Sequence, residues 1–224
     1  MKQLYPDLWQ TRMEQPYATA PDLKTRAYLI ARPDGNVLIY STGLQDEHQA
    51  IAELGGVKRQ YLSHVDEAGP ALAKLRGLFG NELWCHAAEA DAVQRKSGIV
   101  PDHTFNQPQR DLDGALEVLP LPGHTVGSTA FLYRSFEGRK YLFTGDTIGR
   151  TDEGVWTAGL LPFSDKATLA MTLQRMANLE PDVVLSSAFG GACAVTEVTR
   201  EGWRAAIDQA LAPLLRRASS QAQP

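Results

Sequence analysis

The sequence predicts an α/β fold in which strands and helices alternate within one domain, residues 1–224. Apolar residues make up 43% of the 224 residues, which is enough for a sizeable hydrophobic core. Short β-rich runs alternate with segments whose apolar residues recur at helical spacing. No Pro- or Ser-rich linker, low-complexity tract or charge block divides the chain. Such a pattern is typical of packed β-sheets whose outer faces are covered by helices.

The first half begins with two β-rich runs, Thr25–Arg32 and residues 36–41, around Pro33-Asp34-Gly35. Proline presets φ and glycine accepts a positive φ, so these runs are expected to form a hairpin. The elements expected next are a helix over residues 46–54, a strand over 58–63 that ends at His64, a helix from Pro70 that Gly80 closes, a strand over 82–85, a helix over 87–95, and a polar loop through Pro101 and Pro108.

The second half continues with strands at Leu116–Pro120, Thr129–Tyr133 and Lys140–Thr144. A helix from about Asp165 to Leu179 carries its apolar residues on one stripe. The next strand, residues 182–187, contains a continuous apolar run, which indicates burial on both faces. A final helix is expected from about Thr196 to Arg217.

The charge pattern argues against a nucleic-acid or membrane partner. Lys and Arg total 22 against 26 for Asp and Glu, and neither sign gathers into a long run. The first residues contain no continuous apolar segment, and no stretch is long enough to span a membrane. We therefore expect a soluble cytoplasmic protein. With only Cys85 and Cys193 present, a disulfide scaffold and a Cys-rich zinc site are excluded.

Two motifs carry residues suited to metal chemistry. Residues 121–128 read LPGHTVGS and residues 142–147 read LFTGDT. They place His124 and Asp146 just after two predicted strands, and imidazole and carboxylate groups are common ligands of zinc. Glycines in both motifs also suit tight turns, with or without a metal.

The PGHTxGS and LFTGD motifs resemble those of the metallo-β-lactamase superfamily of metal-dependent hydrolases, and the resemblance covers residues from about 25 to 200. It implies a four-layer αβ/βα sandwich, with two mixed β-sheets flanked by helices. It also implies a metal site in loops at one edge of the two sheets.

Family members usually begin this site with a His-x-His-x-Asp-His motif, where this chain reads HVDEAGP from His64. By this resemblance His64 keeps the first ligand and Asp66 stands in the place of the second histidine. Ala68 and Gly69 replace the Asp-His pair, whereas a gapped alignment puts Pro70 and Ala71 there. In both alignments the pair particular to a second metal is missing.

The same resemblance matches His124 to the third histidine and Asp146 to the carboxylate that bridges both metals. The last histidine of the family is replaced by Ala188. The remaining set, His64, His124 and Asp146 with Asp66 as a fourth ligand, suffices for one ion with an open position. Zinc is the first expectation for this divalent ion, and the added Asp makes iron or manganese more competitive.

The expected activity is hydrolysis by a metal-activated water at this reduced, mononuclear site, on a small-molecule substrate that the sequence does not identify. Asp66, Glu67 or Asp146 would act as the base that orients the water. The alternative is a metal-free, non-catalytic descendant of the fold that binds a small molecule or a protein. Loss of four of the seven usual ligand positions keeps this alternative open.

For several other residues the sequence gives weaker indications of a functional role. His48 and His103 lie in polar segments and are expected to be solvated. Cys193 could approach the vacated second-metal region, although a small buried residue is the better interpretation. An apolar cluster at Trp156, Leu160, Leu161 and Phe163 could shape a substrate pocket, pack on the core or form a homodimer contact.

Overall fold

The computed structural model describes residues 1–16, 23–188 and 194–216, and it contains two large mixed sheets. The first sheet has seven strands in the order β1-β2-β3-β4-β5-β6-β7, and its β4, β5, β6 and β7 run parallel. These strands are β1 (Lys2–Tyr5), β2 (Leu8–Gln10), β3 (Tyr28–Ile30), β4 (Val37–Ile39), β5 (Arg59–Tyr61), β6 (Glu82–His86) and β7 (His103–Phe105).

The second sheet has six strands in the order β15-β14-β11-β10-β9-β8, with β11 and β14 parallel. A separate two-stranded hairpin, β12-β13, lies beside it. These strands are β8 (Gln109–Asp111), β9 (Leu116–Pro120), β10 (Thr129–Arg134), β11 (Lys140–Gly145), β12 (Ile148–Arg150), β13 (Trp156–Ala158), β14 (Val183–Ser186) and β15 (Val195–Glu197).

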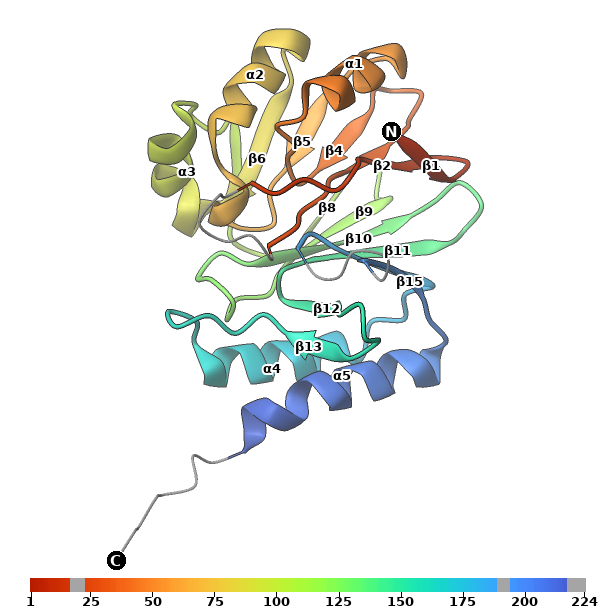
Figure 1. Cartoon of the computed structure of the whole chain (residues 1–224), viewed down its shortest axis with the longest axis vertical. Helices are drawn as coiled ribbons and strands as arrows, with labels where there is room; N and C mark the ends of the chain where they lie inside the picture. Colours follow the sequence, from red (N-terminus) through yellow and green to blue (C-terminus); the bar gives the residue numbers. More distant parts are fainter. Residues whose placement is uncertain (17–22, 189–193, 217–224) are drawn as a thin grey trace, which may run out of the picture.

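Helices cover the outer face of each sheet, so the molecule has four layers (Figure 1). α1 (Gln45–Glu53), α2 (Pro70–Phe79) and α3 (Ala90–Ser97) lie against the first sheet, and short 3₁₀ turns at Val65–Glu67 and Ala87–Glu89 precede α2 and α3. α4 (Lys166–Met176) and α5 (Arg200–Leu215) lie against the second sheet. The predicted αβ/βα sandwich with two mixed sheets is confirmed.

Aromatic side chains fill the space between the two sheets. Tyr28 belongs to β3 and Tyr40 directly follows β4, both in the first sheet. Their ring centroids lie 5.6 Å and 6.4 Å, respectively, from that of Phe143 in the second sheet. All three rings are buried. Tilted and edge-to-face arrangements of this kind add to the free energy gained from burying apolar area.

A second core holds α4 and α5 on the outer face of the second sheet. Leu169, Leu173 and Met176 form the buried stripe of α4, as the helical spacing predicts. Trp203 of α5 is 1% exposed, and its indole Nε1–H donates to the Met176 carbonyl at 2.9 Å. This bond satisfies the one polar atom of a large buried side chain.

The topology brings four strand ends to one edge of the sandwich. β9 and β11 both run antiparallel to β10, so their C-terminal ends lie at the same edge, and β14 runs parallel to β11. In the first sheet, β5 ends at Tyr61 and leads to His64. The residues after β5, β9, β11 and β14 therefore meet where the two sheets come together.

The elements that the sequence failed to predict are short strands, namely β1 and β2 near the N-terminus, the hairpin β12-β13, and the strands β7, β8 and β15. The expected polar loop through Pro101 and Pro108 contains β7 and β8, and the expected final helix begins only at Arg200 because Val195–Glu197 forms β15. β7, β8 and β15 are edge strands, and each pairs with a single neighbour. One side of an edge strand faces solvent, so its sequence lacks the strong apolar pattern that marks a central strand.

Among the described residues, no helix is long and apolar enough to cross a membrane.

The packing of α4 gives a direct test of this arrangement. Leu173 is fully buried against α5, whereas Met171 on the same helix is 57% exposed. We expect Leu173→Ala to lower the free energy of unfolding by about 2–5 kcal/mol, because it removes buried methyl groups and leaves a cavity. Met171→Ala should change it by less than about 0.5 kcal/mol. Urea unfolding of both variants measures the difference, and equal losses would contradict the packing.

Candidate metal centre

His64 comes from the first sheet and is buried at the edge of the sandwich. It follows β5, begins the turn Val65–Glu67, and is 3% exposed. Its Nδ1 lies 2.9 Å from the Ser63 hydroxyl oxygen and 3.3 Å from a Glu67 carboxylate oxygen. The Ser63 hydroxyl in turn bonds the Glu67 carboxylate. An imidazole whose Nδ1–H donates to these acceptors directs its Nε2 lone pair the other way.

His124 comes from the second sheet, in the turn between β9 and β10, and is 2% exposed. Its Nδ1–H donates to the Gly159 carbonyl at 2.7 Å, which again leaves Nε2 as the acceptor atom. The turn is held by the two residues just before α4, because the Ser164 hydroxyl donates to the His124 carbonyl at 2.7 Å and the Asp165 N–H donates to the Gly123 carbonyl at 2.9 Å.

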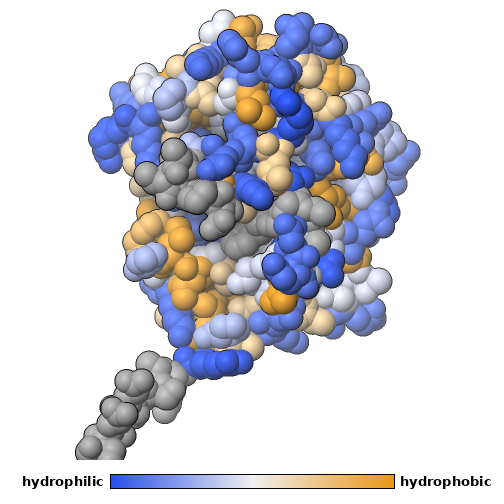
Figure 2. All heavy atoms as spheres, in the orientation of Figure 1, coloured by the Kyte–Doolittle hydropathy of each residue, from blue (hydrophilic) through white to orange (hydrophobic). Residues whose placement is uncertain are grey.

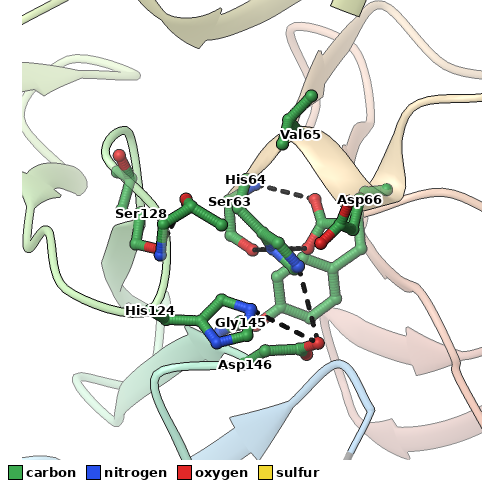
Figure 3. A network of polar contacts seen from close by, with 12 residues as sticks. Ser63, His64, Val65, Asp66, His124, Ser128, Gly145 and Asp146 are labelled. Atoms are coloured by element: carbon green, nitrogen blue, oxygen red, sulfur yellow. Dashed lines mark hydrogen bonds and ion pairs between the residues drawn. The ribbon is translucent and has the colours of Figure 1, made fainter. Parts of the chain in front are cut away.

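Asp146 follows β11 and faces both histidines (Figure 3). Its Oδ2 lies 3.5 Å from His64 Nε2 and 4.0 Å from His124 Nε2. Gly145, immediately before it, has a φ of +55°, and a Cβ there would overlap the Ser63 hydroxyl. Only glycine therefore permits the strand ends of the two sheets to approach this closely.

Three buried polar atoms of these residues have no hydrogen-bond partner among the described residues: His64 Nε2, His124 Nε2 and Asp146 Oδ1. Buried polar atoms are almost always paired, so three such atoms in one place mark this edge of the sandwich as a candidate ligand site. The two imidazole rings lie 4.8 Å apart at 81°. Two imidazole nitrogens and a carboxylate are a donor set that suits a divalent transition metal, so the residues fit such an ion.

Asp66 lies at the wall of the same site. Its ligand atom and those of His64 and His124 all lie within 4.8 Å of one another. One oxygen of the Asp66 carboxylate accepts a hydrogen bond from the Lys96 ammonium at 2.7 Å. Asp66 is thus close enough to His64 and His124 to act as a further ligand. Its carboxylate is also ion-paired with Lys96 of α3.

Charges in the site favour a cation between the histidines. Burial opposes a charged imidazole at His64, but Asp146 and Glu67 outweigh it and raise its pKa well above the usual range. Burial opposes the charge on Asp146 too, but the neighbouring His64 lowers the pKa of that carboxyl. Burial, with His64 beside it, lowers the pKa of His124. Either a proton or a metal ion supplies the favoured positive charge.

Glu67 sits behind His64. Its two oxygens accept from the Ser63 N–H, at 2.7 Å, and from the Ser63 hydroxyl. Burial raises the pKa of this carboxyl, against the opposing effect of His64. A carboxylate that binds the far nitrogen of a ligating histidine fixes its tautomer and its orientation. These contacts favour a positioning role for Glu67, and its predicted role as a base stays untested.

No metal-binding side chain occupies the replaced positions. Ala68, Gly69, Pro70 and Ala71 line the cavity in front of the site, so neither alignment of the first motif restores a ligand. At Ala188 the backbone, rather than a side chain, bonds the Asp146 carboxylate. Cys193 lies outside the described residues.

Sequence reasoning missed the residues that hold this site together from a distance. Tyr40 has a φ of 71°, and its buried hydroxyl donates to the Leu185 carbonyl at 3.1 Å while accepting from the Gly145 N–H at 2.7 Å. It thereby ties the end of β11 to β14. Glu89 is 4% exposed and accepts from the Gly127 N–H at 3.2 Å, below the His124 turn. No local pattern marks either residue, because both act across large sequence separations.

The other histidines lie outside the site. His48 was expected to be solvated, but it is 4% exposed, and its Nε2 is 2.9 Å from the Thr42 carbonyl. That prediction is wrong because α1 packs this polar residue against the loop that follows β4. His103 stacks on Trp84, with ring centroids 4.0 Å apart.

A cavity of about 1010 Å³ opens in front of the candidate ligands. Its walls come from both halves of the sandwich, including Lys74 and Lys96 on one side and Leu160 and Leu161 on the other. Polar groups that converge at the base of a large, mainly apolar cavity are typical of a small-molecule site.

A family model described as the metallo-beta-lactamase superfamily matches residues 63–187, more than half of the chain. Among curated proteins, the hydroxyacylglutathione hydrolase GloC of Haemophilus influenzae is 30% identical over 149 residues. That match covers 57% of this chain and 65% of the relative, just under two thirds of its length.

Solved structures share the fold at lower identity. A metallo-beta-lactamase from Pontibacter korlensis superposes with a TM-score of 0.73 at 17% identity, over 96% of this chain and 98% of that chain. An archaeal metallo-beta-lactamase superfamily protein from Sulfolobus tokodaii gives a TM-score of 0.66 at 16% identity, over 96% and 89% of the two chains.

Gly159 provides a test of how tightly the site is packed. A Cβ at this position would overlap the Asp146 carbonyl and lie 2.9 Å from His124 Nδ1. We expect Gly159→Ala to lower the free energy of unfolding by about 1–3 kcal/mol, because backbone and imidazole must move apart. The control is Gly77→Ala in α2, where a Cβ meets nothing within 4 Å. Urea unfolding compares the two, and a Gly159→Ala variant as stable as the control would refute this packing.

Proposed function

The chain belongs to the metallo-beta-lactamase superfamily, and from this premise we propose that it is a metal-dependent hydrolase with one divalent ion per chain. His64, His124 and Asp146 would hold the ion, with Asp66 as the fourth ligand. Zinc is the ion we propose first, because imidazole nitrogen and carboxylate oxygen are both among its common ligands.

The observation that carries this proposal is a set of three buried atoms without a hydrogen bond, His64 Nε2, His124 Nε2 and Asp146 Oδ1. An unsatisfied buried polar atom costs about 1–3 kcal/mol of stability. In a site without a metal ion, substitutions that remove these groups or give them a hydrogen-bond partner would therefore be favoured. Instead, both imidazoles keep a hydrogen-bond acceptor at Nδ1 and aim Nε2 at one point. Such outer contacts are characteristic of metal-ligating histidines.

A divalent ion held there would supply a Lewis acid that lowers the pKa of water and polarises a scissile carbonyl. Glu67 and Ser63 keep His64 in the tautomer that presents Nε2, and the Gly159 carbonyl does the same for His124. Asp66, at the cavity wall, would serve either as the fourth ligand or as the base that takes a proton from the attacking water. Asp146 lies deeper and faces the two imidazoles.

Thioesters are the substrate class we propose to test first. The relative from Haemophilus influenzae is named for hydrolysis of a glutathione thioester. In such a reaction the water oxygen bonds to the carbonyl carbon, the carbon–sulfur bond breaks, and a water proton ends on the thiol. The cavity is large enough for an acyl group and a thiol half on either side of the carbonyl.

A second candidate function is a metal-free binding module. It is favoured by one observation, the absence of side-chain ligands at Ala68, Gly69 and Ala188 in the described chain. In that case the cavity would bind a small molecule without cleaving it. The metal content of the purified protein separates the two candidates.

Elemental analysis tests the metal site directly. We expect the untagged protein, purified without chelator, to carry close to one equivalent of zinc, iron or manganese. His124→Ala should lose it, because that variant removes a nitrogen ligand. His103→Ala is the matched control, since this histidine stacks on Trp84 away from the site. An absence of metal in the wild-type protein, even after reconstitution, would sink the proposal and favour the binding module.

Glu67→Gln separates a positioning role from a catalytic one. If Glu67 only orients His64, metal affinity should fall about 10- to 100-fold while kcat of the metal-saturated enzyme stays close to that of wild type. Titration with zinc against a chelating indicator, followed by kinetics at saturating metal, gives both quantities. Glu137→Gln at an exposed position is the control. A large loss of kcat at unchanged metal affinity would instead identify Glu67 as the base.

A further inference from the structure

We propose that Tyr40 is a positioning residue for the metal ligand Asp146 and sets how tightly the chain binds a divalent ion. It acts through the Gly145 N–H, and two buried amide side chains, Gln60 and Asn81, hold it in place. This inference rests on the proposed function and adds a determinant of metal affinity that lies outside the ligand set.

The Tyr40 hydroxyl fixes the peptide group that precedes Asp146. It accepts from the Gly145 N–H at 2.7 Å and donates to the Leu185 carbonyl at 3.1 Å. The Gly145 carbonyl accepts from the Ser187 N–H at 3.1 Å, so both backbone polar groups of this glycine are bonded. Asp146 follows directly and faces the two histidines (Figure 3). A shift of the Gly145 peptide would therefore move the carboxylate relative to the imidazoles.

The backbone of Tyr40 is held in an unfavourable conformation. Its φ of 71° lies in the left-handed region, which large side chains rarely adopt. Its N–H donates to the Tyr61 carbonyl at 2.9 Å, and its own carbonyl accepts from Gln60 Nε2 at 2.9 Å. Strained residues persist only where their surroundings hold them firmly, and they gather at functional sites.

Gln60 and Asn81 form a buried relay behind Tyr40. Asn81 Nδ2 donates to Gln60 Oε1 at 3.1 Å, and Gln60 Nε2 then donates to the Tyr40 carbonyl. Gln60 is fully buried and Asn81 is 3% exposed. Burying amide groups is costly unless they are hydrogen-bonded, and these bonds lead to Tyr40. Neither residue is among the described residues that line the cavity, so the relay acts on the site only through Tyr40.

The ring and the hydroxyl of Tyr40 have separate tasks. The ring packs in the core, with its centroid 5.8 Å from that of Tyr28 and 6.4 Å from that of Phe143. The hydroxyl bonds the ends of β11 and β14. Residues 41–44, which follow the left-handed turn, all line the cavity. Removing the hydroxyl alone therefore tests the contact with the ligand-bearing strand and keeps the core packing.

The zinc affinity of Tyr40→Phe tests the proposal. We expect the dissociation constant for zinc to rise about tenfold, as for the loss of an outer contact that orients a metal ligand. Titration of the metal-free protein with zinc against a chelating indicator measures this constant without any substrate. Tyr40 is 1% exposed and is not part of the outer surface that Figure 2 shows, so the substitution leaves the surface charge unchanged.

Tyr141→Phe is the matched control. Tyr141 is fully buried near the other end of β11, and its hydroxyl donates to Asp7 Oδ1 at 3.3 Å. Both variants lose the bonds of a buried hydroxyl, so both should unfold at lower urea concentration than wild type. Only Tyr40→Phe should bind zinc more weakly. A similar loss of zinc affinity in both variants would mean that affinity follows general stability, and it would overturn the inference.

Cobalt(II), supplied in place of zinc, reports the geometry of the ligands. Its visible absorption depends on the arrangement of the donor atoms, and a loss of stability alone does not change that arrangement. We expect Tyr40→Phe to shift the cobalt bands and Tyr141→Phe to give the spectrum of wild type. Wild-type zinc affinity in Tyr40→Phe, or a cobalt spectrum identical to that of wild type, would show that the hydroxyl does not position Asp146.

Gln60→Met tests the relay, because methionine has a similar length and no donor for the Tyr40 carbonyl. We expect its dissociation constant for zinc to rise about threefold, as for the loss of one net hydrogen bond. The double variant with Tyr40→Phe should bind zinc no more weakly than Tyr40→Phe alone, since members of one network are not additive. If Tyr40→Phe does not fold, wild-type zinc affinity in Gln60→Met overturns the inference.

The wild-type titration separates this inference from the proposed function. Wild-type protein that binds no zinc, iron or manganese would refute the proposed function and the inference with it. Wild-type protein that binds zinc, with Tyr40→Phe binding it equally, would leave the proposed function standing and refute the positioning role alone.

Discussion

The site depends on the close approach of two strand ends that belong to different sheets. Ser63 and His64 follow β5 of the first sheet, whereas Gly145 ends β11 of the second sheet and Asp146 follows it. A side chain at residue 145 would overlap the Ser63 hydroxyl. The same hydroxyl bonds Glu67 and lies 2.9 Å from His64 Nδ1. One contact between the sheets thus fixes both the Asp146 carboxylate and the orientation of an imidazole, which is why glycine is required there.

The support of this contact comes from residues far away in the sequence. Tyr40, in a left-handed conformation that is rare for a large side chain, bonds the Gly145 N–H and the Leu185 carbonyl. On the other side, α4 holds the turn that carries His124, because the helix packs directly against Gly123, where a Cβ would overlap the backbone of Leu169. The scaffold therefore holds the imidazoles and the carboxylate from both halves of the sandwich.

The sequence predicts most of the central strands and the helices, because each carries a strong local signal, and the resemblance of its motifs predicts the three residues that converge. Buried strands such as Val183–Ser186 are continuously apolar, and His124 and Asp146 lie in recognisable glycine-rich turns. The edge strands β7, β8 and β15 carry no such signal, since pairing with one neighbour and exposure to solvent leave their composition polar. The role of Tyr40 and the burial of His48 depend on tertiary contacts, which periodicity does not encode.

At the positions where the resembled motifs would hold a second ion, the chain has Ala68, Gly69 and Ala188. Lys96 does not compensate for these losses, because its ammonium binds the Asp66 carboxylate at 2.7 Å and the two opposite charges largely offset each other. On the proposed function, the single ion would lie between His64, His124 and Asp146, and Asp66 would be shared between that ion and Lys96.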